Sequence, residues 1–130
     1  MTTIELHFPG KPQSAVRPRA GRHGFYNPKA GEQYRISREA REQYDGLPLS
    51  TPLVFKLIAV FERPKKLKGV QYVHHDKTPD ASNIVKLYED ALNGIVYDDD
   101  KRIVHLEVTK WTSDGEQEPG VWIEISDDIS

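Results

Sequence analysis

The stretch Leu53–Phe61 reads LVFKLIAVF and carries the strongest β-strand signal in the sequence. Every second residue from Leu53 onward is apolar, and Val54, Ile58 and Val60 add apolar residues in the alternate positions. Successive side chains of a strand point to opposite faces of a sheet, so both faces of this strand are largely apolar. We therefore expect residues 53–61 to form a central strand that is covered on both sides.

Elements of both kinds flank this strand. Residues 3–8 alternate between apolar and polar, which is typical of a half-buried strand. Asn27 and Pro28 have the character of an N-cap and a first helical residue, and Gly94 suits the end of a second helix. The predicted strands are 3–8, 53–61, 103–111 and 121–125, and the predicted helices are 28–44 and 79–94. This order predicts one small α+β domain over residues 1–130, with a mixed sheet packed on two helices.

The length and composition exclude several classes of protein. A chain of 130 residues suits one small core. The absence of cysteine excludes a disulfide framework, a thiol nucleophile and a zinc-thiolate site. The first residues lack the basic start and apolar run of a signal peptide, and no apolar stretch approaches the roughly 20 residues of a bilayer span. We expect a soluble cytoplasmic protein that does not contact membranes.

Charge is distributed unevenly, although the net charge is only −2. Residues 11–41 hold eight lysines and arginines against Glu32 and Glu39, and residues 63–77 form a second basic segment. Residues 98–100, in contrast, are all aspartate. A basic surface beside an acidic cluster is typical of an enzyme that grips phosphates and holds a metal ion, whereas the alternative is ordinary solvated charge.

The second predicted helix brings candidate chemical groups together. Asp80 stands at its N-terminus, and Lys86 follows Ser82 by four residues on the same face. After Gly94 a short apolar step leads to the aspartates at 98–100. If that step runs back beside the helix, the aspartates approach Asp80. Carboxylates from two elements suit Mg²⁺, which prefers oxygen ligands and can assist phosphodiester hydrolysis.

Each of these residues also has an ordinary structural interpretation. Asp80 alone is more often a helix cap, Lys86 a surface lysine, and an aspartate run a solvated loop. His74 and His75 are weak metal candidates because adjacent residues do not converge on one ion. The sequence contains no glycine-rich phosphate loop, serine nucleophile elbow or zinc-protease motif.

The combination of motifs resembles the RusA family of Holliday-junction resolvases, which are crossover junction endodeoxyribonucleases. The helix reads PDASNIVK at 79–86 and EDALNG at 89–94, and YDDDKRIV follows at 97–104. The motifs PGKP at 9–12, RPR at 17–19 and YNPK at 26–29 are similar to the opening of phage and prophage members. The resemblance covers most of the chain in the right order.

The resemblance implies a homodimeric, magnesium-dependent endonuclease, with Mn²⁺ as a substitute metal and no organic cofactor. Such enzymes nick two opposing strands of four-way junction DNA symmetrically, in recombination and repair. In the family the helix motif is proline, aspartate, any residue, aspartate, asparagine, and a further essential aspartate lies in the later acidic pair. Matched by position, the catalytic residues are Asp80, Lys86 and Asp100, and the metal-binding residues are Asp80, Ser82, Asp99 and Asp100, with Asp100 favoured as the ligand.

Ser82 departs from the family pattern, because it stands where the second aspartate is usual. This leaves open the alternative of a structure-specific DNA-binding protein with weak or lost catalysis, and a third interpretation is an unrelated α+β protein with a basic binding arm. Tyr72 and Phe25 are candidates for stacking on an unpaired base at the crossover. The expected DNA-binding residues are Arg17, Arg19, Lys29, Lys65, Lys66, Lys68 and Asn83.

Overall fold

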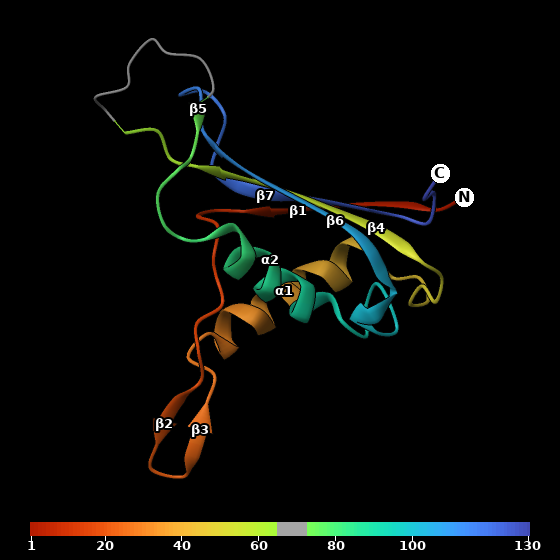
Figure 1. Cartoon of the computed structure of the whole chain (residues 1–130), viewed down its shortest axis with the longest axis horizontal. Coiled ribbons are helices and arrows are strands. Elements are labelled where there is room, and N and C mark those ends of the chain that lie inside the picture. Colours follow the sequence, from red (N-terminus) through yellow and green to blue (C-terminus); the bar gives the residue numbers. More distant parts are fainter. Residues whose placement is uncertain (65–72) are drawn as a thin grey trace.

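A five-stranded mixed sheet forms one layer of the molecule (Figure 1). The structure is a computed structural model and describes residues 1–64 and 73–130. The strand order is β1-β7-β4-β6-β5, so β4 (Leu53–Phe61) is central as predicted. It pairs in parallel with β6 (Ile103–Thr112) and antiparallel with β7 (Gly120–Ser126). The outer strands β1 (Thr3–Pro9) and β5 (Val73–His74) pair antiparallel with β7 and β6, respectively.

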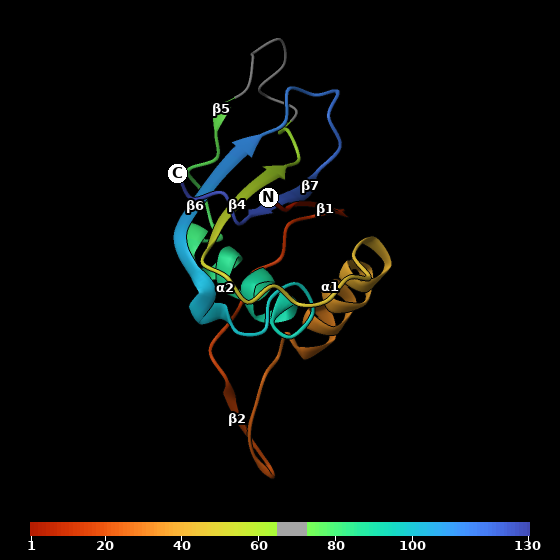
Figure 2. The same cartoon turned by 90° about the vertical axis from the view of Figure 1, so that its right-hand side faces the viewer.

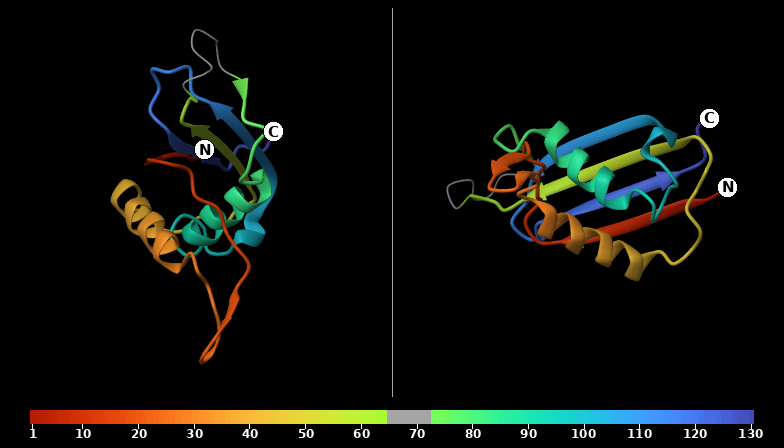
Figure 3. Two further views of the ribbon diagram at one scale, coloured as in Figure 1. Left: turned by 90° about the vertical axis from the view of Figure 1, so that its left-hand side faces the viewer. Right: turned by 90° about the horizontal axis from the view of Figure 1, so that it is seen from below.

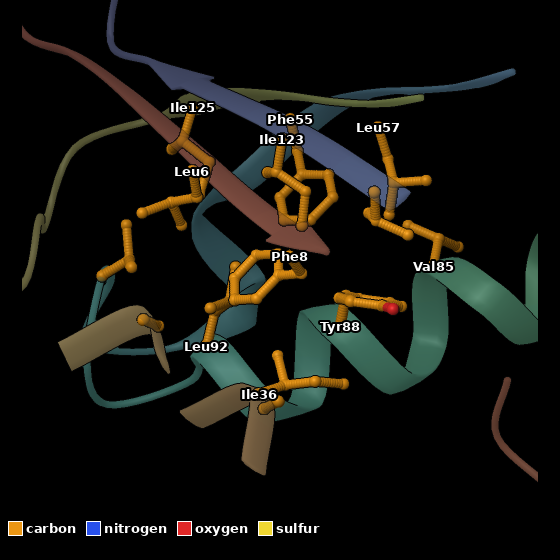
Figure 4. Packing of buried hydrophobic residues seen from close by; sticks show 14 of the residues in the cluster. Leu6, Phe8, Ile36, Phe55, Leu57, Val85, Tyr88, Leu92, Ile123 and Ile125 are labelled. Atoms are coloured by element: carbon orange, nitrogen blue, oxygen red, sulfur yellow. The ribbon is translucent and has the colours of Figure 1, made fainter. Parts of the chain in front are cut away.

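Two helices, α1 (Ala30–Gln43) and α2 (Ala81–Leu92), form a second layer on one face of the sheet (Figures 2 and 3). The buried face of α2 includes Ile84, Tyr88 and Ala91, apolar residues that recur at helical spacing in the sequence. Between the layers, Phe8 of β1 packs on Tyr88, with ring centroids 5.5 Å apart (Figure 4). Burial of each large apolar side chain contributes about 1.5–3 kcal/mol to stability. The α+β class with a mixed sheet and two helices is therefore confirmed.

The face of the sheet opposite the helices is incompletely covered. On this face of β4, Val54 is half-buried and 43% of Ile58 is exposed, whereas Leu53 and Phe55 on the helix side are fully buried. The predicted cover on both sides of β4 is therefore complete on the helix side and partial on the other, where Val60 is buried but Ile58 is exposed. Both helices lie on the same side of the sheet, and the sequence pattern of a single strand does not reveal how many layers pack on it.

The first helix begins later than predicted. Asn27 forms a turn in which its Oδ1 accepts a hydrogen bond of 2.9 Å from the backbone N of Lys29. The helix proper starts at Ala30, with Lys29 as its N-cap residue. Asn27 and Pro28 thus build the approach to the helix and lie just outside it, because the side chain of Asn27 stabilises a turn.

Two regions predicted to lack regular structure contain strands. Residues 13–26 include an antiparallel hairpin of β2 (Arg19–Gly21) and β3 (Gly24–Tyr26), which is separate from the main sheet. The segment 63–77 contains the short edge strand β5. Neither helix of the described ranges has the length and hydrophobicity of a bilayer-spanning segment.

Candidate active site

The start of α2 carries a carboxylate that does not cap the helix. Asp80 is the N-cap residue, but its side chain makes no capping hydrogen bond and is exposed. Ser82 and Asn83 are exposed beside it. The backbone before Asp80 is held by Lys110 of β6, whose Nζ donates to the carbonyl oxygens of Lys77 at 2.6 Å and Pro79 at 2.8 Å. The backbone position of Asp80 is thus fixed by a lysine while its carboxylate stays available to a ligand.

The opposite end of α2 carries the acidic triplet. Gly94, with φ of +84°, reverses the chain after the helix, a conformation that favours glycine. The apolar step 95–97 then packs against the last turns of α2, where the buried Tyr97 donates its Oη–H to the carbonyl oxygen of Glu89 at 2.5 Å. Burial raises the pKa of the Tyr97 hydroxyl, which therefore stays protonated and keeps this hydrogen bond. The step thus returns the chain to the last turns of the helix.

Four carboxylates gather there, two from α2 and two from the turn that precedes β6. Burial raises the pKa of Asp100, and the neighbouring Asp99 and Asp90 raise it further. Burial likewise raises the pKa of Glu89, and Asp100 adds to the effect. The pKa of Asp99 is lowered because its side chain accepts a hydrogen bond from the backbone N of Lys101 at 2.9 Å. This crowding of like charges is what a bound cation would relieve.

Lys86 of α2 forms an ion pair with one member of this acidic group. Its Nζ lies 3.5 Å from Oδ2 of Asp90. The positive charge of Lys86 also offsets part of the rise in the pKa of Asp100. Both members of the ion pair are substantially exposed, at 66% and 37% of their side chains, so the pair contributes at most about 1 kcal/mol. Lys86 can therefore exchange Asp90 for a phosphate at little cost.

The structure brings Lys86, Asp99 and Asp100 together but does not bring Asp80 into the same group. Asp80 precedes Lys86 by six residues, which is about 9 Å along a helix axis. It is not among the groups that shift the pKa of Asp100. Within residues 1–64 and 73–130 no three His, Asp or Glu side chains are arranged to hold a metal ion.

The donor chemistry still fits magnesium. Every candidate ligand offers oxygen, and Mg²⁺ is commonly bound by only one or two carboxylates, with waters and substrate phosphates completing its shell. Asp80 or the Asp99–Asp100 pair can supply such a partial set. Glu89 and Asp90 belong to the same acidic group but were not among the predicted ligands. Their spacing of three and four residues after Lys86 is the sequence signal that could have identified them.

The N-terminal connection that carries Arg17 and Arg19, here called the basic arm, starts at the candidate site. The backbone N of Ala15 donates to the carbonyl oxygen of Asn83 at 2.8 Å, which ties the N-terminal connection to the first turn of α2. Arg17 and Arg19 follow and are exposed. The two acids among residues 11–41, Glu32 and Glu39, are both paired with Arg35, at 3.1 Å and 2.8 Å. Among the described residues these acids therefore pair within α1 and not with Arg17 or Arg19.

A cavity of about 930 Å³ lies between this connection and the segment before α2. Lys29 lines it and is fixed there by a hydrogen bond of 3.0 Å from its Nζ to Oε1 of Gln13. The cavity reaches Pro79, next to Asp80. Its wall also includes Lys11, Gln13, Ser14, Glu62, His75, Thr78 and Glu118. Lys29 thus lines the same cavity as Pro79, the residue before Asp80.

Other predicted residues have different outcomes. Lys65, Lys66, Lys68 and Tyr72 lie outside the described residues. His74 stacks on Trp111 with ring centroids 4.2 Å apart, and His75 stacks on Phe61 at 3.9 Å. The adjacent histidines thus make separate aromatic contacts.

Comparison with protein families identifies a matching family. The model of the family described as endodeoxyribonuclease RusA matches residues 9–126. Comparison with curated protein sequences gives no match. The matched range contains both helices, the basic arm and all the candidate catalytic residues. Members of the family are Holliday-junction resolvases that bind junction DNA, generally as dimers, and that generally depend on a divalent metal. The chain belongs to the RusA family and is an endodeoxyribonuclease of the Holliday-junction resolvase type.

Proposed function

We propose that this chain acts as a homodimeric, Mg²⁺-dependent resolvase that makes paired, symmetric nicks in four-way DNA junctions, with Mn²⁺ as a substitute metal. The observation that carries the proposal is the exposed face of α2. Asp80 begins the helix and its side chain makes no capping hydrogen bond, and Lys86 is exposed further along. Asp99 and Asp100 adjoin Lys86, and the chain that leads to Arg17 and Arg19 is tied to the first turn through Ala15. We also propose that it acts in the cytoplasm, as the resemblance to phage and prophage members implies.

The residues divide the work of phosphodiester hydrolysis. When bound, magnesium supplies charge neutralisation at the phosphate and an activated water. Asp80 with Ser82 would supply one partial set of oxygen ligands for it and Asp100 with Asp99 another, because the two carboxylates do not lie in one group in this structure. Lys86, released from its weak pair with Asp90, would orient the scissile phosphate and stabilise the charge that develops in the transition state.

Contacts to the DNA backbone would position the substrate. The arm residues Arg17 and Arg19, and Lys29 in the adjoining cavity, would bind phosphates that flank the cut. Asn83 would contact the DNA from the first turn of α2. The basic segment would add Lys65, Lys66 and Lys68. Such contacts give salt-dependent affinity without reading sequence.

Dimerisation explains why the cuts are paired. A four-way junction has near two-fold symmetry, and a two-fold dimer presents two equivalent sites to opposing strands. Light scattering coupled to size-exclusion chromatography should give a molar mass twice the chain mass of 14.9 kDa. A plasmid that extrudes a cruciform separates the outcomes, because paired nicks linearise the circle whereas independent nicks leave nicked circles.

The central experiment is cleavage of a synthetic four-way junction with Mg²⁺ and with EDTA. We expect Asp80→Asn and Asp100→Asn to lower the rate by about 100-fold or more while junction binding is kept. Asp99→Asn tests whether its carboxylate is also a ligand. Asp45→Asn, which changes an exposed acid beyond α1, is the matched control and should cut like the parent. Full cutting in EDTA would overturn the metal mechanism.

A second candidate function is structure-specific DNA binding with weak or lost catalysis. The observation that favours it is Ser82, an uncharged residue at the position where the family pattern has an aspartate. Tight junction binding by the parent without cleavage in either Mg²⁺ or Mn²⁺ would establish this alternative.

A further inference from the structure

The β2–β3 hairpin projects from the molecule on the side of the helices (Figures 1 and 2). Within residues 1–64 and 73–130 its two strands pair only with each other, and every residue from 16 to 27 is exposed. Within the hairpin, 80% of Phe25 and 52% of Tyr26 are exposed. Large aromatic side chains held this far from any core bury nothing within this chain, and as consecutive strand residues Phe25 and Tyr26 expose one ring on each face of the hairpin.

The pairing of the strands sorts the hairpin side chains by face. Arg19 lies opposite Tyr26, and Ala20 lies opposite Phe25. Cross-strand partners share a face, so Phe25 stands beside only a methyl group on its side. The ring therefore has a free aromatic surface that no neighbouring large side chain of the hairpin covers. Gly24, with φ of +109°, allows the tight reversal before Phe25.

The charge of residues 11–31 indicates which class of ligand the hairpin binds. Residues 11–31 contain no aspartate or glutamate but include Arg17, Arg19, Arg22, Lys11 and Lys29. An acid-free arginine segment with exposed aromatic rings fits nucleic acid, because guanidinium groups bind phosphates and aromatic rings stack on bases. A ring stacks on a base only where that base is separated from its neighbour, as happens at the branch point of a junction.

The base of the hairpin is fixed beside the candidate active site. One leg is tied by the hydrogen bond from Ala15 to Asn83, and the other by the bond between Lys29 and Gln13. Both ties lie near the first turn of α2. A hairpin anchored in this way reaches bases a few nucleotides from a phosphate bound near Asp80.

We propose that the hairpin is a wedge that enters the branch point of the bound junction, with Phe25 stacked on a separated base and Arg17, Arg19 and Arg22 on the surrounding phosphates. The proposal rests on the proposed function, since it names the part of the chain that reads the branched shape of the substrate. Phe25 in this role positions the DNA and takes no part in bond cleavage.

The test uses junctions that carry the fluorescent base 2-aminopurine, with EDTA present to prevent cutting. One junction has the probe at the branch point, and a second has it in the middle of an arm. The parent should change the fluorescence of the first probe and leave the second unchanged. Phe25→Ser should abolish that change at saturating protein and weaken binding by about 5- to 150-fold, the range for loss of one base-stacking contact.

Two further variants complete the design. Phe25→Trp keeps an aromatic face and should restore the fluorescence change. Tyr34→Ser removes an aromatic side chain that is 68% exposed on α1, away from the hairpin, and should behave like the parent. The hairpin lies outside the core, so thermal unfolding of Phe25→Ser should match that of the parent.

The outcomes separate the two proposals. If Phe25→Ser binds with the parent's affinity and gives the same fluorescence change, the wedge is excluded while junction cleavage by the parent still supports the proposed function. If the parent does not prefer a junction over duplex DNA, both proposals fail.

Discussion

Ser82 is the residue at which this chain departs most from the family motif, and it is exposed on the first turn of α2. A hydroxyl oxygen can ligate magnesium but brings no charge. We predict that Ser82→Asp lowers the Mg²⁺ concentration for half-maximal cleavage. A charge 4 Å from another contributes about 1 kcal/mol even in water, so a shift of about five-fold or more is expected.

The measurement for Ser82 is a magnesium titration of the cleavage rate for mutant and parent. Ser82→Ala serves as the control, since it removes the hydroxyl without adding charge. An unchanged or higher midpoint in Ser82→Asp would mean that another carboxylate already fills the role, and Asp99 would be the first to test.

Asp114 provides a prediction about pH. Its pKa is lowered, mainly because its carboxylate accepts hydrogen bonds from the backbone N of Gln117 and of Glu116. A lowered pKa in the folded state contributes stability at pH values above the ordinary pKa of aspartate, and that contribution is lost as pH falls through the lowered value. We predict that Asp114→Asn lowers the melting temperature near pH 7 and that the difference from the parent shrinks toward pH 3 or below. A constant difference at all pH values would show that the carboxylate charge is not the cause.

At the scale of elements, the contact between β6 and the start of α2 determines where Asp80 lies. Lys110 of β6 donates to two carbonyl oxygens on either side of Thr78, and Asp80 follows directly. We predict that Lys110→Met raises the Mg²⁺ concentration for half-maximal cleavage by about three-fold or more, because each lost charge-assisted hydrogen bond is worth about 1.5 kcal/mol or more to that local geometry.

A purely structural role of Lys110 would lower thermal stability but leave the magnesium midpoint unchanged, so both quantities are measured. Lys56→Met is the matched control, because Lys56 is an exposed lysine on the neighbouring strand β4. Lys110→Arg keeps the charge and should recover part of the midpoint. A parent-like midpoint in a folded Lys110→Met protein would contradict the prediction.

The basic arm is the second element with a specific expectation. Pro18 stiffens the chain between Arg17 and Arg19, and alternate residues of an extended segment point the same way. We predict that Arg17→Ala and Arg19→Ala each weaken junction binding and lower the slope of log affinity against log salt by about one unit. Titrations at several salt concentrations give that slope. Arg38→Ala on α1, which removes an arginine paired with Glu42 at 3.8 Å, should leave it unchanged.

At the scale of the whole molecule, the sequence predicted the strands and helices better than the geometry of the site. Leu53–Phe61 is a strand as expected, and Ile84 and Tyr88 mark the buried face of α2, because local alternation and helical periodicity follow burial directly. The hairpin escaped prediction because it packs on no core and so shows no apolar period. Its signal was the pair Gly21 and Gly24 around a two-residue turn.

The site was predictable in its residue types but not in its geometry. The motif identified Asp80, Lys86 and the acidic triplet, whereas the path of residues 95–97 decides which end of α2 the triplet joins. The role of Lys110 had no local signal, since its partners lie 33 and 31 residues away in the chain. Contacts over such separations depend on the pairing of strands, which one sequence does not determine.

The position of β7 has a consequence for biosynthesis. This strand, Gly120–Ser126, lies between β1 and β4, so the first strand joins the sheet only through the last one (Figure 3). A nascent chain that has not yet delivered residues 120–126 from the ribosome leaves Phe8 and Phe55 without the strand that buries them. The sheet is therefore completed only after residues 120–126 have been translated, and a product that stops before Gly120 should be cleared by proteolysis as an unfolded chain without cutting DNA.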